Sequence, residues 1–228
     1  MKKLALLLLI GLLLFLCNCQ KKLPVRQITD WSIVVSREAI PAEQYAAKEF
    51  RNLFEQTTGF RLPIVIDQPS AQGNVFIGYS EKLSDKGLDP EKNDLGEEGF
   101  TIKITENSLA IVGGRPRGSL YGVYEFFERY FGFRFLTANH TYFPGNGDQV
   151  RLPQEVFSYK PVFIFRWPFY GEVKQNPRFA ARLRINTVTE EDSLGFTTRQ
   201  RLINHSFHRQ IPVQKYGKTH PEYFALIN

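Results

Sequence analysis

Cysteine, methionine and tryptophan are scarce in this chain of 228 residues, which contains two, one and two of them. Two cysteines can form neither a framework of several disulfides nor a four-cysteine zinc site. A strong excess of one charge sign is also missing, since 29 Lys and Arg stand against 23 Asp and Glu. Loss of Lys2 and Lys3 with a leader would lower the net charge from +6 to +4. So small an excess argues against a nucleic-acid partner.

The abundant residues are typical of a folded protein. Hydrophobic residues make up 43% of the chain, aromatic residues 14% and charged residues 23%. This composition excludes disordered, collagenous and polytopic membrane proteins. The length allows one large domain, or one domain with a piece of another.

The longest apolar run lies near the N-terminus and predicts a signal peptide. Residues 1–3 are Met-Lys-Lys, and residues 4–16 carry only apolar or small side chains. Thirteen helical residues span roughly 20 Å, less than the hydrocarbon core of about 30 Å. A signal peptide over residues 1–19 is therefore favoured over a spanning anchor.

A cysteine motif follows the apolar run. Leu16-Cys17-Asn18-Cys19 resembles a loose bacterial lipobox, which makes Cys19 the expected site of lipidation. Asn18 replaces the usual small residue, so Cys17 remains a second candidate. The alternative is an ordinary secretory signal with incidental cysteines. The motif predicts an exported protein, held by lipid in the outer membrane or periplasm or at the cell surface.

Residues 26–153 predict one compact accessory domain. A helix is expected from Pro41 until Gly59, because apolar residues recur at helical spacing and glycine suits a left-handed cap. A second amphipathic helix follows Gly118 and stops at Gly132. β-branched and aromatic runs predict strands at 31–35, 63–67, 74–78, 99–105, 108–112 and 133–136. The order predicts an α+β fold, with a mostly antiparallel sheet and two helices on one face.

The glycine-rich loop 113–118 precedes the second helix. Helix N-termini bind anions, so the loop has a phosphate-binding interpretation. Its spacing fits neither the P-loop nor the dinucleotide fingerprint. Close packing of the helix on the sheet is the favoured explanation, and no cofactor is expected.

A series of short motifs carries a family resemblance. They are Ala46-Ala47-x-x-Phe50, Thr58-Gly59, Val75-Phe76-Ile77-Gly78, Gly99-Phe100, Ile111-Val112-Gly113-Gly114 and Arg117-Gly118-x-x-Tyr121-Gly122-Val123-Tyr124-Glu125-Phe126. The series resembles the small domain before the barrel in α-glucuronidases of glycoside hydrolase family 67. It also resembles the second domain of family 20 β-hexosaminidases, and most of all the bacterial domain of unknown function 4838. Phe133 and Phe135 stand where relatives often have Cys and Trp.

Residues 158–228 look like the start of a β/α barrel. Pro161-x-Phe163-x-x-Arg166 is similar to the first barrel strand of family 20, in which the arginine binds sugar hydroxyls. The resemblance makes Arg166 a candidate substrate-binding residue, because strand ends carry the sites of such barrels. Trp167 offers a stacking face. The alternatives are a surface arginine and a core aromatic residue.

The residues after Arg166 add a helix, a second barrel strand and an acidic run. A helix is expected at 176–183, and residues 184–188 are similar to a Lys-x-Asn strand of family 20. Residues 190–192 are acidic and invite a glycosidase carboxylate pair. In the enzymes resembled, the acid and its partner come from later strands, so this run is expected to be solvated. The catalytic residues therefore stay unknown.

Histidines mark the last motifs. Asn204-His205-Ser206-Phe207-His208 and the run from His220 recur in the unknown-function family. Their spacing, with Glu222, matches no zinc signature, so no metal is expected. Ser206 lacks a nucleophile elbow. His205 is the candidate polar residue lining a sugar site.

The barrel region is short. Residues 158–228 number 71, whereas a closed barrel needs about 200–250. We expect the N-terminal portion of an exported glycoside-hydrolase-like protein that hydrolyses uronic-acid or amino-sugar linkages, with this part inactive alone. The expected partners are a carbohydrate substrate and, through the lipid, a membrane. The alternative is a non-catalytic surface module that binds carbohydrate or serves as structure only.

Overall fold

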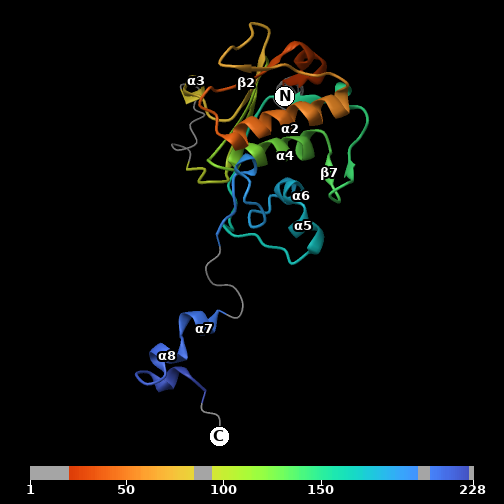
Figure 1. The fold of residues 1–228 in the computed structure, drawn as a ribbon. Coiled ribbons are helices and arrows are strands. Elements are labelled where there is room, and N and C mark those ends of the chain that lie inside the picture. Colours follow the sequence, from red (N-terminus) through yellow and green to blue (C-terminus); the bar gives the residue numbers. More distant parts are fainter. Residues whose placement is uncertain (1–20, 85–93, 200–205, 226–228) are drawn as a thin grey trace, which may run out of the picture. The chain divides into compact units, whose positions relative to one another are not determined.

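The computed structural model describes residues 21–84, 94–199 and 206–225 (Figure 1). These residues fall into two compact units, the first ending at Thr197 and the second starting at Thr198. The predicted signal peptide, the predicted lipidation site Cys19 and the predicted sugar-site residue His205 lie outside the described residues. The predicted division into residues 1–19, 26–153 and 158–228 stays a prediction.

A six-stranded sheet forms the centre of the first unit. Its strands, in spatial order, are β10 (Val156–Tyr159), β5 (Phe100–Ile104), β6 (Ser108–Gly113), β4 (Asn74–Ile77), β2 (Ser32–Val35) and β3 (Ile64–Ile66). β3, β2, β4 and β6 run parallel to one another, and β5 is antiparallel to both β6 and β10. β2 and β3 can run parallel because a long helix returns the chain between them.

Two small sheets flank the central one. β1 (Lys22–Pro24) pairs with β9 (Arg151–Pro153), and β7 (Arg134–Phe135) pairs with β8 (Thr141–Tyr142). Among the described strands, antiparallel pairings therefore outnumber parallel ones by four to three, which fits the α+β class expected. Within the central sheet alone, three of the five strand pairings are parallel.

The two predicted helices are present. α2 (Pro41–Thr58) has proline in its first turn, and the Glu43 carboxylate accepts a hydrogen bond from the backbone N–H of Ile40 at 3.1 Å. Gly59 ends it with φ of 79°, a conformation that costs glycine little. α4 (Gly118–Tyr130) stops two residues before Gly132. Both helices lie side by side over the sheet (Figure 1).

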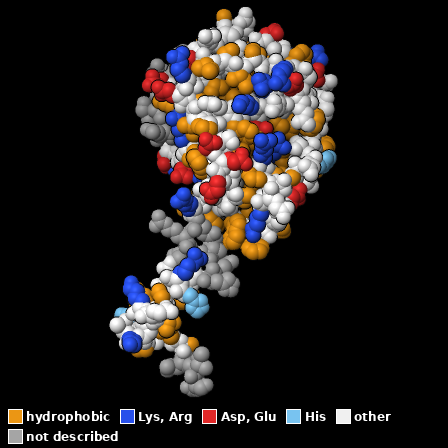
Figure 2. Space-filling model, in the orientation of Figure 1, with side chains coloured by type: hydrophobic (Ala, Val, Ile, Leu, Met, Phe, Trp, Pro, Cys, Tyr) orange, Lys and Arg blue, Asp and Glu red, His pale blue; other side chains and the backbone are white. Residues whose placement is uncertain are grey.

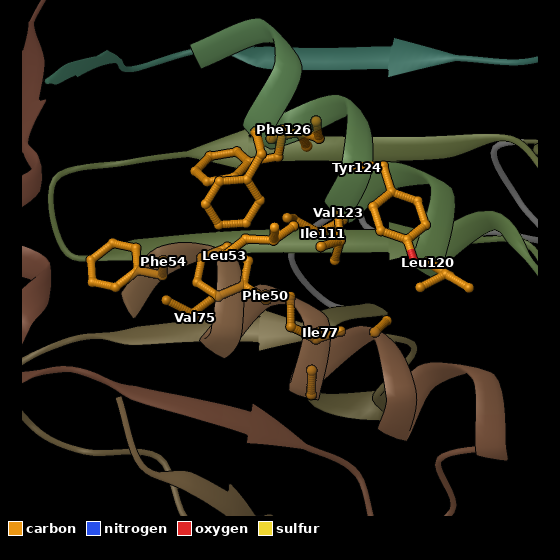
Figure 3. Close-up of a cluster of buried hydrophobic side chains, with 14 of the residues drawn as sticks. Phe50, Leu53, Phe54, Val75, Ile77, Ile111, Leu120, Val123, Tyr124 and Phe126 are labelled. Atoms are coloured by element: carbon orange, nitrogen blue, oxygen red, sulfur yellow. The ribbon is translucent and has the colours of Figure 1, made fainter. Parts of the chain in front are cut away.

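The main core fills the space between these helices and one face of the sheet. Phe50 of α2 contacts Phe126 of α4, with ring centroids 5.4 Å apart, and Phe54 belongs to the same cluster (Figure 3). Alternate strand residues such as Ile33, Val75 and Ile111 point to the same side. This burial confirms that both helices cover one face. A smaller cluster lies on the other face: Val34, Phe76, Leu83, Ala110 and Val112.

Short helices complete the described residues. The first unit adds η1 (Val25–Asp30), α3 (Glu81–Ser84), η2 (Gly147–Gln149), α5 (Gly171–Gln175), α6 (Pro177–Arg182) and η3 (Asp192–Leu194). The second unit contains α7 (Phe207–Gln210), α8 (Val213–Tyr216) and η4 (Pro221–Tyr223). α6 confirms the helix expected at 176–183. Among the described residues, no helix is long and apolar enough to cross a membrane.

The prediction of two barrel strands after β10 was wrong. Residues 161–166 and 184–188 form no strand, although the structure describes both segments. A strand requires a neighbour with which its backbone groups can pair regularly. Here side chains satisfy the backbone instead: the Arg166 N–H donates to Asn186 Oδ1 at 3.0 Å, and the Asn186 amide donates to the Ile164 carbonyl at 2.9 Å.

Candidate functional site

The glycine loop positions the start of α4 by close packing. A Cβ on Gly113 would lie 2.1 Å from the Gly118 carbonyl carbon, and a Cβ on Gly114 would lie 1.5 Å from the Gly96 oxygen. No side chain fits at such distances, so the loop lies directly against neighbouring backbone. This confirms the packing explanation of the loop. It also places Arg117 beside the chain at Glu97 and Glu98.

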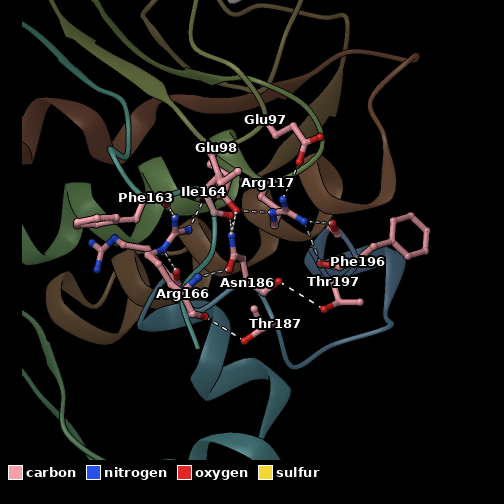
Figure 4. Close-up of polar contacts among 12 residues, drawn as sticks. Glu97, Glu98, Arg117, Phe163, Ile164, Arg166, Asn186, Thr187, Phe196 and Thr197 are labelled. Atoms are coloured by element: carbon pink, nitrogen blue, oxygen red, sulfur yellow. Dashed lines mark hydrogen bonds and ion pairs between the residues drawn. The ribbon is translucent and has the colours of Figure 1, made fainter. Parts of the chain in front are cut away.

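Glu98 is the centre of a buried polar cluster (Figure 4). Its Oε1 accepts from Arg117 Nε at 2.8 Å and from the Asn186 amide at 2.7 Å. Its Oε2 accepts from Arg166 Nη2. A buried carboxylate is costly unless charge and hydrogen bonds compensate it, and two guanidinium groups do so here. We call Glu98, Arg117, Arg166 and Asn186 the Glu98 cluster.

Arg117 links the cluster to a distant loop. Its Nη1 donates to the carbonyls of Gly195 at 3.1 Å and Phe196 at 3.2 Å, while its Nη2 donates to Glu97 at 2.8 Å. The Arg117 side chain is only 4% exposed. Its guanidinium group therefore fixes the path of the chain after η3.

Arg166, the predicted sugar-binding residue, is held by the protein through its three guanidinium nitrogens. Nε donates to the Arg184 carbonyl at 2.7 Å, Nη1 to the Phe163 carbonyl at 2.6 Å and Nη2 to Glu98. Its guanidinium carbon lies 5.9 Å from the Tyr121 ring centroid, and burial is the main cause that raises the pKa of that tyrosine. The arginine thus fixes the backbone of its own segment. Its contact with sugar stays a prediction.

The segment around Arg166 exposes apolar side chains. Phe163, Phe169 and Tyr170 are 74%, 74% and 73% exposed. The Trp167 ring lies edge-on to Phe169, with centroids 5.3 Å apart, and Lys174 Nζ lies 4.0 Å from the Phe169 centroid. Apolar surface gathered in this way is typical of an interaction site. We call residues 162–170 the aromatic segment.

A second buried cluster attaches α6 to the two long helices. Glu49 of α2 accepts hydrogen bonds from the Tyr124 hydroxyl at 3.1 Å and from Arg182 Nη2 at 3.1 Å. Burial, followed by the Glu49 carboxylate, raises the pKa of Tyr45 to about 12. The same causes raise the pKa of Tyr124. Arg184 adds ion pairs to Glu125 and Glu128 of α4.

The acidic run and the described histidine motif, both singled out from the sequence, take no part in the two buried clusters. Glu190, Glu191 and Asp192 are exposed, which confirms that this acidic run is solvated. In the second unit, His220 Nδ1 lies 2.9 Å from a Glu222 oxygen, and its ring stacks on Tyr223 at 4.7 Å. The described residues contain no group of three or more His, Cys, Asp or Glu side chains arranged to hold a metal.

Charge on the surface is mixed in sign. Figure 2 shows acidic and basic side chains interspersed on the visible face of the first unit. The modest net charge of +6 agrees with this distribution. A single-sign field that would steer a polyanion is not present on that face.

The fold and the two clusters define an α+β accessory domain followed by a segment attached to it. Each part of the chain matches a family model. Residues 18–126 match the family described as glycosyl hydrolase family 67 N-terminus, and residues 135–228 match the domain of unknown function DUF4838. The resemblances to the family 67 domain and to the domain of unknown function 4838, expected from the sequence, are confirmed. The chain therefore carries a glycoside-hydrolase-like domain.

Individual relatives are distant. The chain is 29% identical over 112 residues to a probable alpha-glucuronidase A of Aspergillus fumigatus, covering 48% of this chain and 12% of that protein. The GH20 beta-N-acetylhexosaminidase of Streptomyces coelicolor matches at 15% identity and a TM-score of 0.46, over 70% of this chain and 30% of its own. The GH115 4-O-methyl-alpha-glucuronidase BtGH115A matches at 13% identity and a TM-score of 0.47. That match covers 86% of this chain and 34% of BtGH115A. The chain thus spans a small part of each relative.

Proposed function

We propose that the chain is the non-catalytic N-terminal portion of an exported carbohydrate-active protein that acts on uronic-acid or amino-sugar linkages. The family 67 N-terminus over residues 18–126 supports the carbohydrate class. The name of the curated relative, an alpha-glucuronidase, supports a uronic acid as one target. In this proposal the chain contacts glycan and does not hydrolyse it.

The observation that carries the proposal is the aromatic segment held in place by Arg166. The Glu98 cluster fixes the arginine on the buried side, while Trp167, Phe169 and Tyr170 follow it on the chain. Aromatic rings that are exposed, on a backbone that is held in place, offer flat apolar faces. They lose little conformational entropy on binding. Sugar rings present apolar C–H faces of matching shape. Arg166, Trp167 and His205 remain the proposed substrate-binding residues.

The carboxylates of the clusters argue against catalysis by this chain. Glycosidases use two carboxyl groups that flank the scissile bond. Glu98 and Glu49 are instead engaged by arginines in the interior. We propose that the acid and nucleophile of the active protein lie outside this chain.

Calorimetric titration tests the proposal. The full chain in mild detergent is titrated with a glucuronic-acid-containing oligosaccharide and with an N-acetylglucosamine oligosaccharide. We expect saturable binding to one of them, with Phe169→Ala weakening affinity about tenfold, the loss of about 1.4 kcal/mol from one stacking face. Phe60→Ala removes a ring that is also exposed and lies outside the aromatic segment, and it should leave affinity unchanged.

Two kinds of result would contradict the proposed function. Binding that is equally lost in Phe169→Ala and Phe60→Ala, or equally kept in both, contradicts the role of the aromatic segment. Release of p-nitrophenol from aryl glucuronides or aryl N-acetylglucosaminides by this chain would contradict its non-catalytic part.

The lipid anchor is a separate element of the proposal. Cys19 follows the apolar run at the position expected for acylation. In a bacterial host fed labelled palmitate, the chain and its Cys17→Ser variant should carry label, whereas Cys19→Ser should not. Label retained in Cys19→Ser would overturn the assignment.

A further inference from the structure

The four parallel strands of the central sheet end at one edge, and a distinct set of polar side chains follows them there. Ser36 and Arg37 come directly after β2, Asp67 after β3 and Tyr79 after β4. Arg115 follows β6, which runs parallel to β4. Strands that are parallel deliver the residues at their carboxyl ends to the same side of the molecule.

The chain leaves neighbouring strands at this edge toward opposite faces of the sheet. After β2 it enters α2, whose apolar residues pack with Ile33 and Val35 on the main-core face. After β4 it enters α3, whose Leu83 packs with Val34 and Phe76 on the other face. In open α/β sheets, a crevice opens outside the strand ends where connections diverge in this way, and ligands bind in it.

A cavity of about 390 Å³ lies at this divergence. That volume falls in the lower part of the range for small-molecule sites, roughly 300–1,000 Å³. We call it the switch-point cleft. Its lining includes Ser36, Arg37, Asp67, Tyr79, Ser80 and Arg115.

The wall of the cleft is rigidly built around Glu43. This carboxylate is 2% exposed and accepts from Arg115 Nη2 at 3.0 Å and from the Tyr79 backbone N–H at 3.3 Å. Arg115 Nη2 also donates to the Glu38 carbonyl at 3.2 Å. The Arg37 backbone N–H donates to Asp67 Oδ2 at 3.2 Å. Tyr79 and Arg115 are therefore positioned before any ligand arrives, which lowers the entropic cost of binding.

The lining chemistry selects a ligand rich in hydroxyl groups. Two guanidinium groups, of Arg37 and Arg115, face three carboxylates, of Glu38, Asp67 and Glu81. Such a balance disfavours a polyanion such as a nucleotide, because the carboxylates repel it. Hydroxyl groups, by contrast, donate to carboxylates and accept from guanidinium groups. Tyr79 adds an aromatic ring to this polar set.

We propose that the switch-point cleft is a saccharide-binding site separate from the aromatic segment. The proposal rests on the proposed carbohydrate function and adds a second place of contact, on the accessory domain itself. Its residues come from the ends of β2, β3, β4 and β6, whereas the aromatic segment follows β10. Different side chains therefore carry the two sites, and variants can separate them.

An NMR titration of the full chain in mild detergent tests the cleft. Addition of the glucuronic-acid-containing oligosaccharide, and separately of the N-acetylglucosamine oligosaccharide, should shift backbone amide signals of residues 36–38 and 79–81. Arg37→Ala and Tyr79→Ala should weaken the affinity measured from these shifts about tenfold. Arg151→Ala and Tyr142→Ala, which alter exposed residues of the same types on β9 and β8, should leave it unchanged.

The outcomes distinguish this inference from the proposed function. Shifts confined to residues 163–170, with normal affinity in Arg37→Ala and Tyr79→Ala, overturn the cleft and leave the aromatic segment in place. Shifts confined to the cleft support it and contradict the aromatic segment. An absence of shifts with both oligosaccharides overturns the cleft. If Tyr79→Ala fails to fold, Arg37→Ala decides, because Arg37 is exposed.

Discussion

Glu98 lies between the guanidinium groups of Arg117 and Arg166, and its side chain is 7% exposed. Four segments of the chain meet at this one carboxylate: the residues just before β5, the start of α4, the segment at Arg166 and the chain near Asn186. Buried charges of this kind give little net stability over an apolar core, yet removing one partner leaves the others uncompensated. Glu98 is therefore a residue whose loss the fold tolerates poorly.

Glu98→Gln should lower the free energy of unfolding by about 3–5 kcal/mol, because two arginines lose their counter-charge in the interior. Glu97→Gln is a matched control, since Glu97 binds the same Arg117 but is 70% exposed. It should cost less than about 1 kcal/mol. Urea unfolding followed by circular dichroism measures both. Equal losses in the two variants would contradict the account of the cluster.

Two tyrosines near Glu49, the half-buried Tyr45 and the buried Tyr124, predict that the fold becomes less stable at alkaline pH. Burial and Glu49 raise the pKa of Tyr45 from 10.0 to about 12, and they also raise the pKa of Tyr124. A tyrosine that is harder to deprotonate in the folded state favours unfolding once pH exceeds its unfolded pKa. Stability should be intact below pH 10 and fall as pH rises from 10 toward 12.

The tyrosine prediction is checked by unfolding free energies measured across that pH window. Tyr45→Phe should reduce the decline, because the phenol that titrates is gone. Tyr142→Phe, at a position 53% exposed, should leave the decline as steep as in the unaltered chain. A decline unaffected by Tyr45→Phe would be inconsistent with the assignment.

Among the elements, α2 and α4 were the most predictable from sequence. Apolar residues at helical spacing, proline at the start of α2 and glycine just past its end fix that helix within one residue. The strands β2, β4, β5 and β6 were also found, since each is a run of β-branched or aromatic residues. The parallel pairing of β2 with β4 and of β4 with β6 was not predicted, because parallel and antiparallel neighbours draw on the same residue types.

Short edge elements escaped prediction for a different reason. β1, β8 and β9 have two or three residues each, too few to show a periodic pattern, and β1 and β9 pair with each other although they lie far apart in sequence. The run 161–166 shows the converse error. Its apolar pattern suits a strand, but Arg166 and Asn186 satisfy the backbone instead. The local sequence pattern of this run favours a strand, but hydrogen bonds to residues distant in sequence determine its conformation.

The aromatic packing between α2 and α4 should contribute strongly to the stability of the core. Phe127 is fully buried, and four other rings lie with centroids 5.2 or 5.3 Å from its own: Phe50, Phe126, Phe131 and Phe133. Phe127→Ala should lower the free energy of unfolding by about 3–5 kcal/mol through the cavity it leaves. Phe60→Ala, at an exposed position, should change it by less than about 1 kcal/mol. Comparable losses would contradict this packing.

At the scale of the first unit, arginines hold the later residues onto the α+β core. Arg182 reaches Glu49 of α2, Arg184 reaches α4, and Arg117 holds the loop at Gly195. Apolar residues of α6 and η3 join the same core: Phe179, Ala180, Ala181 and Leu194. The described residues up to Thr197 therefore form one packed body, with the aromatic segment on its surface.

The site was only partly visible in the sequence. The resemblance to family 20 singled out Arg166 and Trp167, which the structure describes, and His205, which lies outside the described residues. Glu98, Arg117 and Asn186 were missed as a group, because no local pattern shows that three separated polar residues share one interior. The switch-point cleft was missed as well, since it depends on strand order. A parallel assignment of β2, β3 and β4 would have indicated it.

The most direct test of the account asks whether the unaltered chain recognises saccharide. Saturation-transfer difference NMR on the full chain with the glucuronic-acid-containing and N-acetylglucosamine oligosaccharides detects weak contact, which suits a non-catalytic domain. We predict transfer of saturation from the protein to ring protons of at least one oligosaccharide. No transfer to either, from a chain shown to be folded, would contradict the carbohydrate function.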